Sequence, residues 1–254
     1  MKWKRRNKIK KWIIAIIGGL TIIIVIAVLW EIRNIGWPIT TKVHNGKIQV
    51  IDVSFYNGTI NWKKVKDQQI NHAMLKIGSG IDRNHRGSED KKFAVNARNA
   101  KYASIYRGVY YYSYAKNIDD AKKEAQHCIS ILKKHQIKPS DLDLPVALDI
   151  EEKSVFQTGR KNVTAITVTF CKEIKKAGYT PMIYSQAYAL RNYFDYSKIK
   201  SYKIWVAHYT KASEPSVPFE YDMWQYTSKA SISGANTGMG YCDLNYYMVE
   251  KNTN

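Results

Sequence analysis

Apolar segments of strand length alternate with segments of helical pattern from residue 47 onward. Because a strand, a helix and a following strand join by a right-handed crossover, this alternation predicts a parallel sheet. The fold class is α/β: a TIM-type (β/α) barrel that is incomplete in its second half, where loops replace the helices. The predicted strands are 47–54, 72–77, 107–113, 144–151, 181–185, 203–209, 221–226 and 241–247, and the predicted helices are 61–69, 89–102, 119–135 and 163–177.

Acidic residues mark the ends of the first, fourth and last predicted strands. Asp149 and Glu151 end the fourth strand and project to the same side, since side chains alternate along a strand. At about 6.6 Å between Cα atoms, such carboxylates can act as an acid and a partner that stabilises positive charge. Asp52 ends the first strand and Asp243 lies in the last one. In a closed barrel these two strands pair, so all four carboxylates should meet at one mouth.

Aromatic residues follow the same strand ends. Each one alone can be explained by packing against a helix, but a ring at a strand end can also stack on the face of a sugar. Acids together with aromatics in a cleft suit a neutral polysaccharide better than a phosphate compound. The candidates for substrate binding are Tyr56, Tyr112, Tyr184, Trp205, Tyr209 and Trp224.

The N-terminal segment predicts a membrane anchor. Residues 1–11 are basic without an acid, and residues 12–30 carry no charge and have a tryptophan at each end. A helix of that length rises about 28 Å, close to the thickness of the hydrocarbon core. A core helix would show a polar stripe, and a cleaved signal peptide would have a shorter apolar region and a small-residue cleavage site. We therefore expect a cytoplasmic segment 1–11, a transmembrane helix 12–30, a stalk 31–46 and an extracellular domain 47–254 that faces the cell wall.

The charge indicates a polyanionic partner. The net charge is +19, and residues 1–35 account for +7 of it, with eight Lys or Arg and one Glu. The remainder is basic enough to favour an anionic cell-wall polymer or membrane surface. No nucleic-acid motif accompanies the charge, so no nucleic acid is expected as a partner. The three cysteines and six histidines lack metal-ligand spacing, and Gly78-Ser79-Gly80 lacks the remainder of a phosphate loop, so we expect neither metal nor cofactor.

Eleven short motifs, in order over residues 48–249, resemble glycoside hydrolase family 25, the muramidase-type lysozymes. They are Ile51-Asp52-Val53-Ser54, Asn57-Gly58, Ile60-Asn61-Trp62, Ala73-Met74-Leu75-Lys76-Ile77-Gly78, Asp90-x-x-Phe93, Gly108-Val109-Tyr110-Tyr111-Tyr112-Ser113-Tyr114-Ala115, Leu148-Asp149-Ile150-Glu151, Pro181-Met182-Ile183-Tyr184-Ser185, Ile204-Trp205-Val206-Ala207-His208-Tyr209, Met223-Trp224-Gln225-Tyr226 and Cys242-Asp243-Leu244-Asn245.

The resemblance implies an incomplete α/β barrel that cleaves the β-1,4 bond between N-acetylmuramic acid and N-acetylglucosamine in peptidoglycan. It implies that Glu151 is the catalytic acid, Asp149 its partner carboxylate, and Asp52 and Asp243 supporting acids. The resemblance also implies that Gln225 binds the substrate. We expect the charge on Asp149 to raise the pKa of Glu151 and so keep it protonated. The spacing of the two carboxylates allows two routes for the second step: attack by the N-acetyl oxygen of the substrate, or an inverting route in which water attacks.

Two alternatives use the same barrel. A family 18 chitinase also has an Asp-x-Glu strand end, but with a further Asp two residues earlier, where this chain has Ala147. A non-catalytic glycan-binding or cell-wall assembly protein would not require all four acids. The cell process that the protein serves, which includes wall remodelling, secretion or conjugation and phage lysis, stays open at this point.

Overall fold

The computed structural model describes residues 46–80, 87–235, 238 and 240–249. The chain divides into two units, Met1–Thr40 and Thr41–Asn254, and the described residues all belong to the second. No helix among these residues is long and apolar enough to cross a membrane. The predicted span 12–30 lies outside the described residues, as do residues 31–45 of the predicted stalk.

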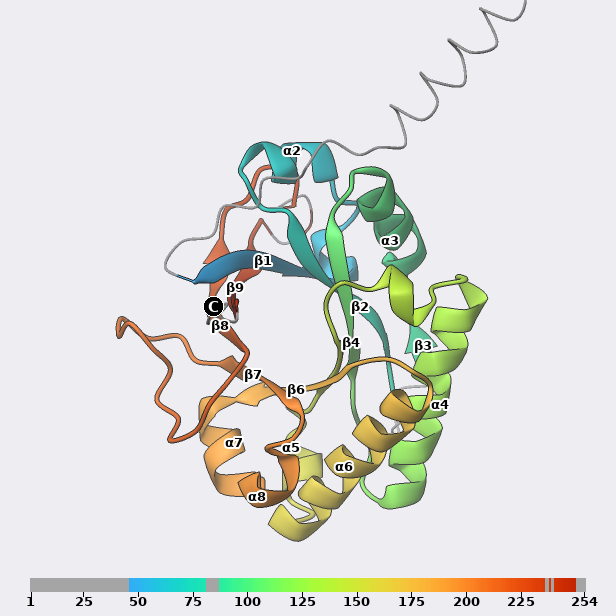
Figure 1. The fold of residues 1–254 in the computed structure, drawn as a ribbon, viewed down its shortest axis with the longest axis vertical. Coiled ribbons are helices and arrows are strands. Elements are labelled where there is room, and N and C mark those ends of the chain that lie inside the picture. The colour runs from blue at the N-terminus through green and yellow to red at the C-terminus, as the bar shows by residue number, and fades with distance from the viewer. Residues whose placement is uncertain (1–45, 81–86, 236–237, 239, 250–254) are drawn as a thin grey trace, which may run out of the picture. The chain divides into compact units, whose positions relative to one another are not determined.

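Eight strands close into a barrel (Figure 1), which confirms the predicted fold class. The order around the barrel is β1, β9, β8, β7, β6, β5, β4 and β2, and β1 pairs with β2 to close it. The short strand β3 pairs with β2 outside the ring. The strands are β1 (Lys47–Val53), β2 (His72–Ser79), β3 (Ser88–Glu89), β4 (Tyr106–Tyr112), β5 (Val146–Asp149), β6 (Pro181–Gln186), β7 (Lys203–Ala207), β8 (Met223–Ala230) and β9 (Cys242–Met248).

The helices are concentrated in the first part of the barrel. After β7 the described chain passes through β8 and β9 with no helix between them, as the sequence predicts for the second half. The helices α7 and α8 between β6 and β7 are short and were not predicted. The helices are α2 (Trp62–Asp67), α3 (Phe93–Tyr102), α4 (Ile118–Lys134), α5 (Lys153–Phe156), α6 (Arg160–Lys176), α7 (Ala187–Tyr193) and α8 (Tyr196–Ile199), with 3-10 turns η1 (Phe55–Asn57) and η2 (Pro139–Asp141).

The last strand, β9, runs antiparallel to its two neighbours. β9 pairs antiparallel with both β8 and β1, so the prediction of a purely parallel sheet is wrong at this strand. The reason is the connection: a parallel neighbour requires a crossover of a dozen or more residues, usually a helix, whereas a short loop can return the chain only antiparallel. β9 therefore begins at the mouth of the barrel instead of ending there.

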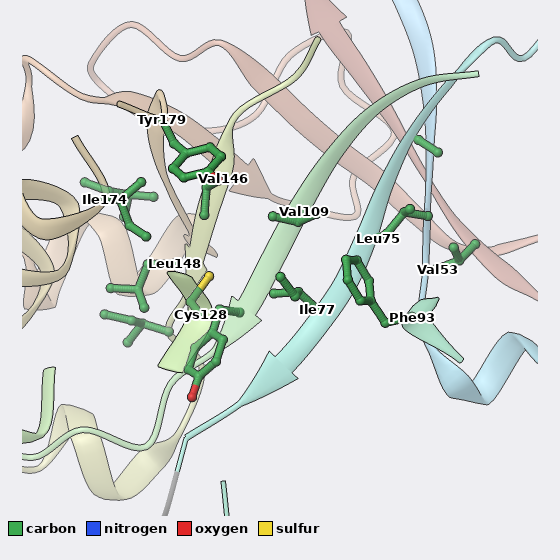
Figure 2. Packing of buried hydrophobic residues seen from close by; sticks show 14 of the residues in the cluster. Val53, Leu75, Ile77, Phe93, Val109, Cys128, Val146, Leu148, Ile174 and Tyr179 are labelled. Atoms are coloured by element: carbon green, nitrogen blue, oxygen red, sulfur yellow. The ribbon is translucent and has the colours of Figure 1, made fainter. Parts of the chain in front are cut away.

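Two layers of apolar side chains hold the barrel. The interior is filled by residues such as Val50, Met74, Met182 and Met223. The outer layer joins the strands to the helices, and Figure 2 shows Leu75, Val109 and Leu148 on the strands with side chains from the surrounding elements. α4 packs against α6, and α6 against β5 and β6. Burying apolar surface on both faces of the sheet explains why the strands read as continuous apolar runs.

Candidate active site

The four acids predicted at the strand ends line one cavity of about 180 Å³ at the mouth of the barrel. Asp52 comes from β1, Asp149 from the end of β5 and Asp243 from the start of β9. Glu151 lies two residues beyond β5, so the predicted strand 144–151 is too long at both ends. The alternation continues past the strand: Ile150 is buried in the outer core, while Asp149 and Glu151 both reach the cavity.

Asp52 and Asp243 are cross-strand partners. They face each other in the antiparallel register of β1 and β9, as expected for a last strand that closes on the first. Burial raises the pKa of Asp243 to about 9, and the charge of Asp52 adds to this effect. Burial also raises the pKa of Asp52, while hydrogen bonds from Asn245, Gln225 and Asp243 oppose the rise. The two carboxyl groups therefore share a proton, which Asp243 holds while Asp52 accepts.

Two amide side chains hold Asp52 in place. Asn245 Nδ2 donates to Asp52 Oδ2 at 2.7 Å and to the carbonyl of Val50 at 2.9 Å. Gln225 Nε2 donates to the same Asp52 oxygen at 3.1 Å. The amide oxygens are also used: Trp205 Nε1 donates to Asn245 Oδ1 at 2.8 Å, and Tyr184 Oη donates to Gln225 Oε1 at 2.9 Å. One carboxylate thereby fixes side chains from four strands.

Asp149 and Glu151 differ in their surroundings. Asp149 is buried, and among the described residues its Oδ1 atom has no hydrogen-bond partner. Burial raises the pKa of Asp149 well above its usual range, and the charge of Glu151 adds to the rise. Glu151 is half-buried at the edge of the cavity, where a bound molecule can reach it.

Burial is also the largest cause of the raised pKa of Glu151. A hydrogen bond with Tyr184 lowers this pKa, and the charges of Asp52 and Glu152 raise it. The sequence predicts that the charge of Asp149 raises the pKa of Glu151, but burial is the largest cause, and the charges that raise this pKa are those of Asp52 and Glu152. The physical reason is that Asp149 lies deeper and loses more hydration, so the repulsion within the pair acts chiefly on Asp149. Burial of Glu151 therefore favours its protonated form.

The predicted substrate-binding residues divide into three groups. Tyr56, Tyr112, Tyr184, Trp205 and Gln225 line the cavity with the acids. Tyr209 lies just beyond it, and its hydroxyl donates to Gln225 Oε1 at 2.7 Å. Trp224 does not line the cavity: it is 4% exposed, and its Nε1 donates to the carbonyl of His208. Since neighbours on a strand face opposite sides, the inward position of Gln225 places Trp224 on the outside of the barrel.

Four residues at the mouth were not predicted as site residues: Ser54, Lys76 and Tyr110, which line the cavity, and Asn245. Asn245 holds Asp52, and Lys76 is the one basic residue among the described residues that line the cavity. Its amino group lies 4.7 Å from the centre of the Tyr112 ring, and its charge lowers the pKa of Asp149 and of Glu151. Alternation could have found Asn245, which lies two residues after Asp243 and so faces the same side.

A buried glutamate outside the cavity supports the loop after β4. Glu124 of α4 accepts a hydrogen bond from Ser113 Oγ at 2.6 Å and one from the backbone N–H of Tyr114 at 2.9 Å. The backbone N–H of Ser113 in turn donates to the carbonyl of Asp149 at 2.8 Å. Glu124 is thus connected to the end of β5 through one loop residue. Burial raises its pKa to about 7.

We predict that Glu124→Gln weakens the pH dependence of stability. A carboxyl group whose pKa rises from 4.5 to about 7 on folding favours the folded state below pH 4.5 and loses that contribution as the pH rises through 7. The loss amounts to about 3 kcal/mol. Urea unfolding at pH 5 and pH 8 should therefore show a smaller difference for Glu124→Gln than for the wild type. Glu214→Gln, which removes an exposed carboxylate, is the control, and equal differences in all three proteins would contradict the prediction.

No group of three His, Cys, Asp or Glu side chains is placed to hold a metal ion within the described ranges.

Comparison with known proteins agrees with this geometry. The model of a family described as glycosyl hydrolases family 25 matches residues 51–235. Lysozyme M1 from Streptomyces globisporus is 36% identical over 66 residues, which are 26% of this chain and 21% of that protein.

Solved structures show the same fold. The modular autolysin LytC from Streptococcus pneumoniae, in complex with a synthetic peptidoglycan ligand, is 29% identical with a TM-score of 0.67, over 78% of this chain and 46% of that one. A family 25 glycosyl hydrolase from Bacillus anthracis is 23% identical with a TM-score of 0.63, over 84% of this chain and 93% of that one. The chain spans less than half the length of LytC and about a fifth of lysozyme M1.

Proposed function

Because the chain belongs to glycoside hydrolase family 25, we propose that it is a muramidase that cleaves the β-1,4 bond between N-acetylmuramic acid and N-acetylglucosamine in peptidoglycan. The observation that carries the proposal is the mouth itself, where Glu151 and three further carboxylates line one cavity with aromatic rings. The peptidoglycan ligand of LytC and the lysozyme activity in the name of the Streptomyces relative support the substrate class.

Glu151 acts as the general acid in this proposal. Burial raises its pKa and so favours the protonated form, and its position at the cavity edge lets it donate that proton to the oxygen of the glycosidic bond. The bond between this oxygen and the anomeric carbon breaks, its electron pair stays on the leaving oxygen, and positive charge develops on the sugar. Water finally supplies the hydroxyl group of the new reducing end, and its proton restores Glu151.

Asp149 stabilises the positive charge in either route. In one route the N-acetyl oxygen of the substrate attacks and Asp149 holds the cation that results; in the other, water attacks directly. This role requires the ionised form of Asp149: burial raises the pKa of the carboxyl group, whereas the charge of Lys76 lowers it and a positive charge on the sugar would lower it further. Asp52 and Asp243 are supporting acids: they help to position the side chains at the mouth and contribute to its electrostatic environment.

We predict that Glu151→Gln abolishes most of the activity, since it removes the transferable proton and keeps the shape. General acid catalysis contributes roughly 10²–10⁴-fold, so the rate should fall at least that far. Asp149→Asn should be severely impaired as well, and Asp52→Asn and Asp243→Asn less so. The measurement is the release of reducing ends from purified peptidoglycan, followed by identification of the sugar at each new end.

Muramic acid at the new reducing ends is the expected product, and glucosamine there would exclude a muramidase. The exposed Glu220→Gln is the matched control for Glu151→Gln. A wild-type protein that binds peptidoglycan without cutting it would support the non-catalytic glycan-binding alternative. Full activity in Glu151→Gln would exclude this residue as the acid.

We also propose that residues 12–30 anchor the enzyme in the cell membrane, with residues 1–11 in the cytoplasm and the catalytic domain facing the wall. The support comes from the uncharged segment and its basic N-terminal flank. An anchored muramidase can cut only the wall near the membrane, which favours local opening or remodelling over bulk lysis.

The anchor predicts the topology of the chain. Protease added to intact cells stripped of their wall should degrade everything after residue 36, because that part lies outside. A cytoplasmic protein in the same cells should stay intact, which controls for lysis. Protection of the domain from protease would contradict the proposed orientation.

The basic charge of the chain leads us to propose an anionic wall polymer as an additional partner. The purified protein should bind such a polymer at low salt, and binding should weaken as salt screens the exposed charges. Retention that does not change with salt concentration would argue for a specific sugar-binding site in place of charge attraction.

A further inference from the structure

A second cavity shares Glu151 with the acidic mouth. It has a volume of about 310 Å³ and is lined by Gln186, Ala187, Tyr188, Arg191, Ala207, His208 and Tyr209 in addition to Glu151. Glu151 borders both cavities, and the other three acids line only the first. The proton donor therefore stands between two spaces of different character: one acidic, the other aromatic and basic.

The position of the proton donor assigns a side of the substrate to each cavity. The sugar that develops positive charge must lie beside the carboxylates that stabilise it, which are in the first cavity. The leaving sugar is bonded to the oxygen that Glu151 protonates and therefore extends into the second. Tyr188 and Tyr209 are 61% and 56% exposed there, and exposed rings of this kind suit the face of a sugar.

Arg191 is a fixed cation at this second cavity. Its Nη1 donates to the carbonyl and to the hydroxyl of Ser216, which holds the guanidinium in place. Ser216 is itself held, because its backbone N–H donates to His208 Nδ1 at 3.0 Å. Within the described part of the chain, no carboxylate forms an ion pair with Arg191, and its Nε and Nη2 atoms have no hydrogen-bond partner. A guanidinium presents N–H groups in a fork that matches a carboxylate.

We propose that the second cavity binds the leaving side of the glycan and that Arg191 pairs with a free carboxylate of the peptide carried by the next muramic acid. The inference rests on the proposed muramidase function. The leaving glucosamine is uncharged, and the sugar after it carries a peptide with free carboxyl groups. Arg191 would then make the enzyme prefer glycan chains whose peptides keep their free carboxylates.

The test compares two forms of one substrate. Peptidoglycan strands are used with their peptide carboxylates free, and again after these groups have been converted to carboxamides, which removes charge and keeps shape. We expect Arg191→Gln in the full-length protein to raise KM on the free-carboxylate strands about three- to tenfold, the range for a partly screened charged contact. The change should reside in KM and not in kcat, and the gap to the wild type should close on the carboxamide strands.

Three further variants separate charge from structure. Arg191→Lys keeps the charge and should recover part of the affinity. Ser216→Ala removes only the hydroxyl that Arg191 contacts and should have a smaller effect than Arg191→Gln. Arg98→Gln on α3 removes an exposed arginine that lines neither cavity, so this variant should leave KM unaltered.

The outcomes separate this inference from the function on which it rests. An equal KM for wild type and Arg191→Gln on the free-carboxylate strands would overturn the pairing. The same increase on both forms of the substrate would also overturn it, because Arg191 would then act only by holding the Ser216 loop. A wild-type enzyme that cuts neither form would instead refute the proposed muramidase activity.

Discussion

The hydrogen bonds that converge on Asp52 are the interaction on which the mouth of the barrel depends. A buried carboxylate is costly unless donors replace the water it has lost. Here Asn245 and Gln225 supply those donors, and the neighbouring carboxyl group of Asp243 supplies another. Because each amide has a second partner, the same bonds orient Trp205 and Tyr184. Loss of the charge on Asp52 would therefore release a wall of the site as well as one of its acids.

The reversal of β9 is what allows this arrangement. A strand parallel to the others would bring its carboxyl end to the mouth and would need a helix to cross back. The antiparallel strand brings its beginning there instead, so that Asp243 and Asn245 follow directly from the loop that enters the strand. The position of these two site residues thus follows from the antiparallel return of the chain from β8 into β9.

Much of this could be predicted from the sequence, because the features concerned are local. Hydrophobic periodicity located the barrel strands, and the acids at their ends followed from the geometry of barrels. The direction of β9 was missed, since periodicity does not record the direction of a strand. The outward position of Trp224 was missed for a related reason: alternation fixes faces only once one residue has been assigned to a side. Glu124 and Arg191 gave no signal, because a charged residue on a helix is usually solvated, and only the fold shows what lies beside it.

The charge state of the mouth follows from its crowding. Four carboxyl groups share a cavity with one described lysine, and burial raises the pKa of each of them. Full ionisation would leave several like charges in a space that water only partly screens, so the mouth without substrate retains protons. The raised pKa of Glu151 favours its protonated form, which the proposed role as general acid requires. Burial raises the pKa of Asp149 further, and a positive charge beside this carboxyl group would lower its pKa and favour the ionised form. In the proposed mechanism the same crowding therefore favours a proton on Glu151, and the charge that develops on the sugar favours the ionised form of Asp149.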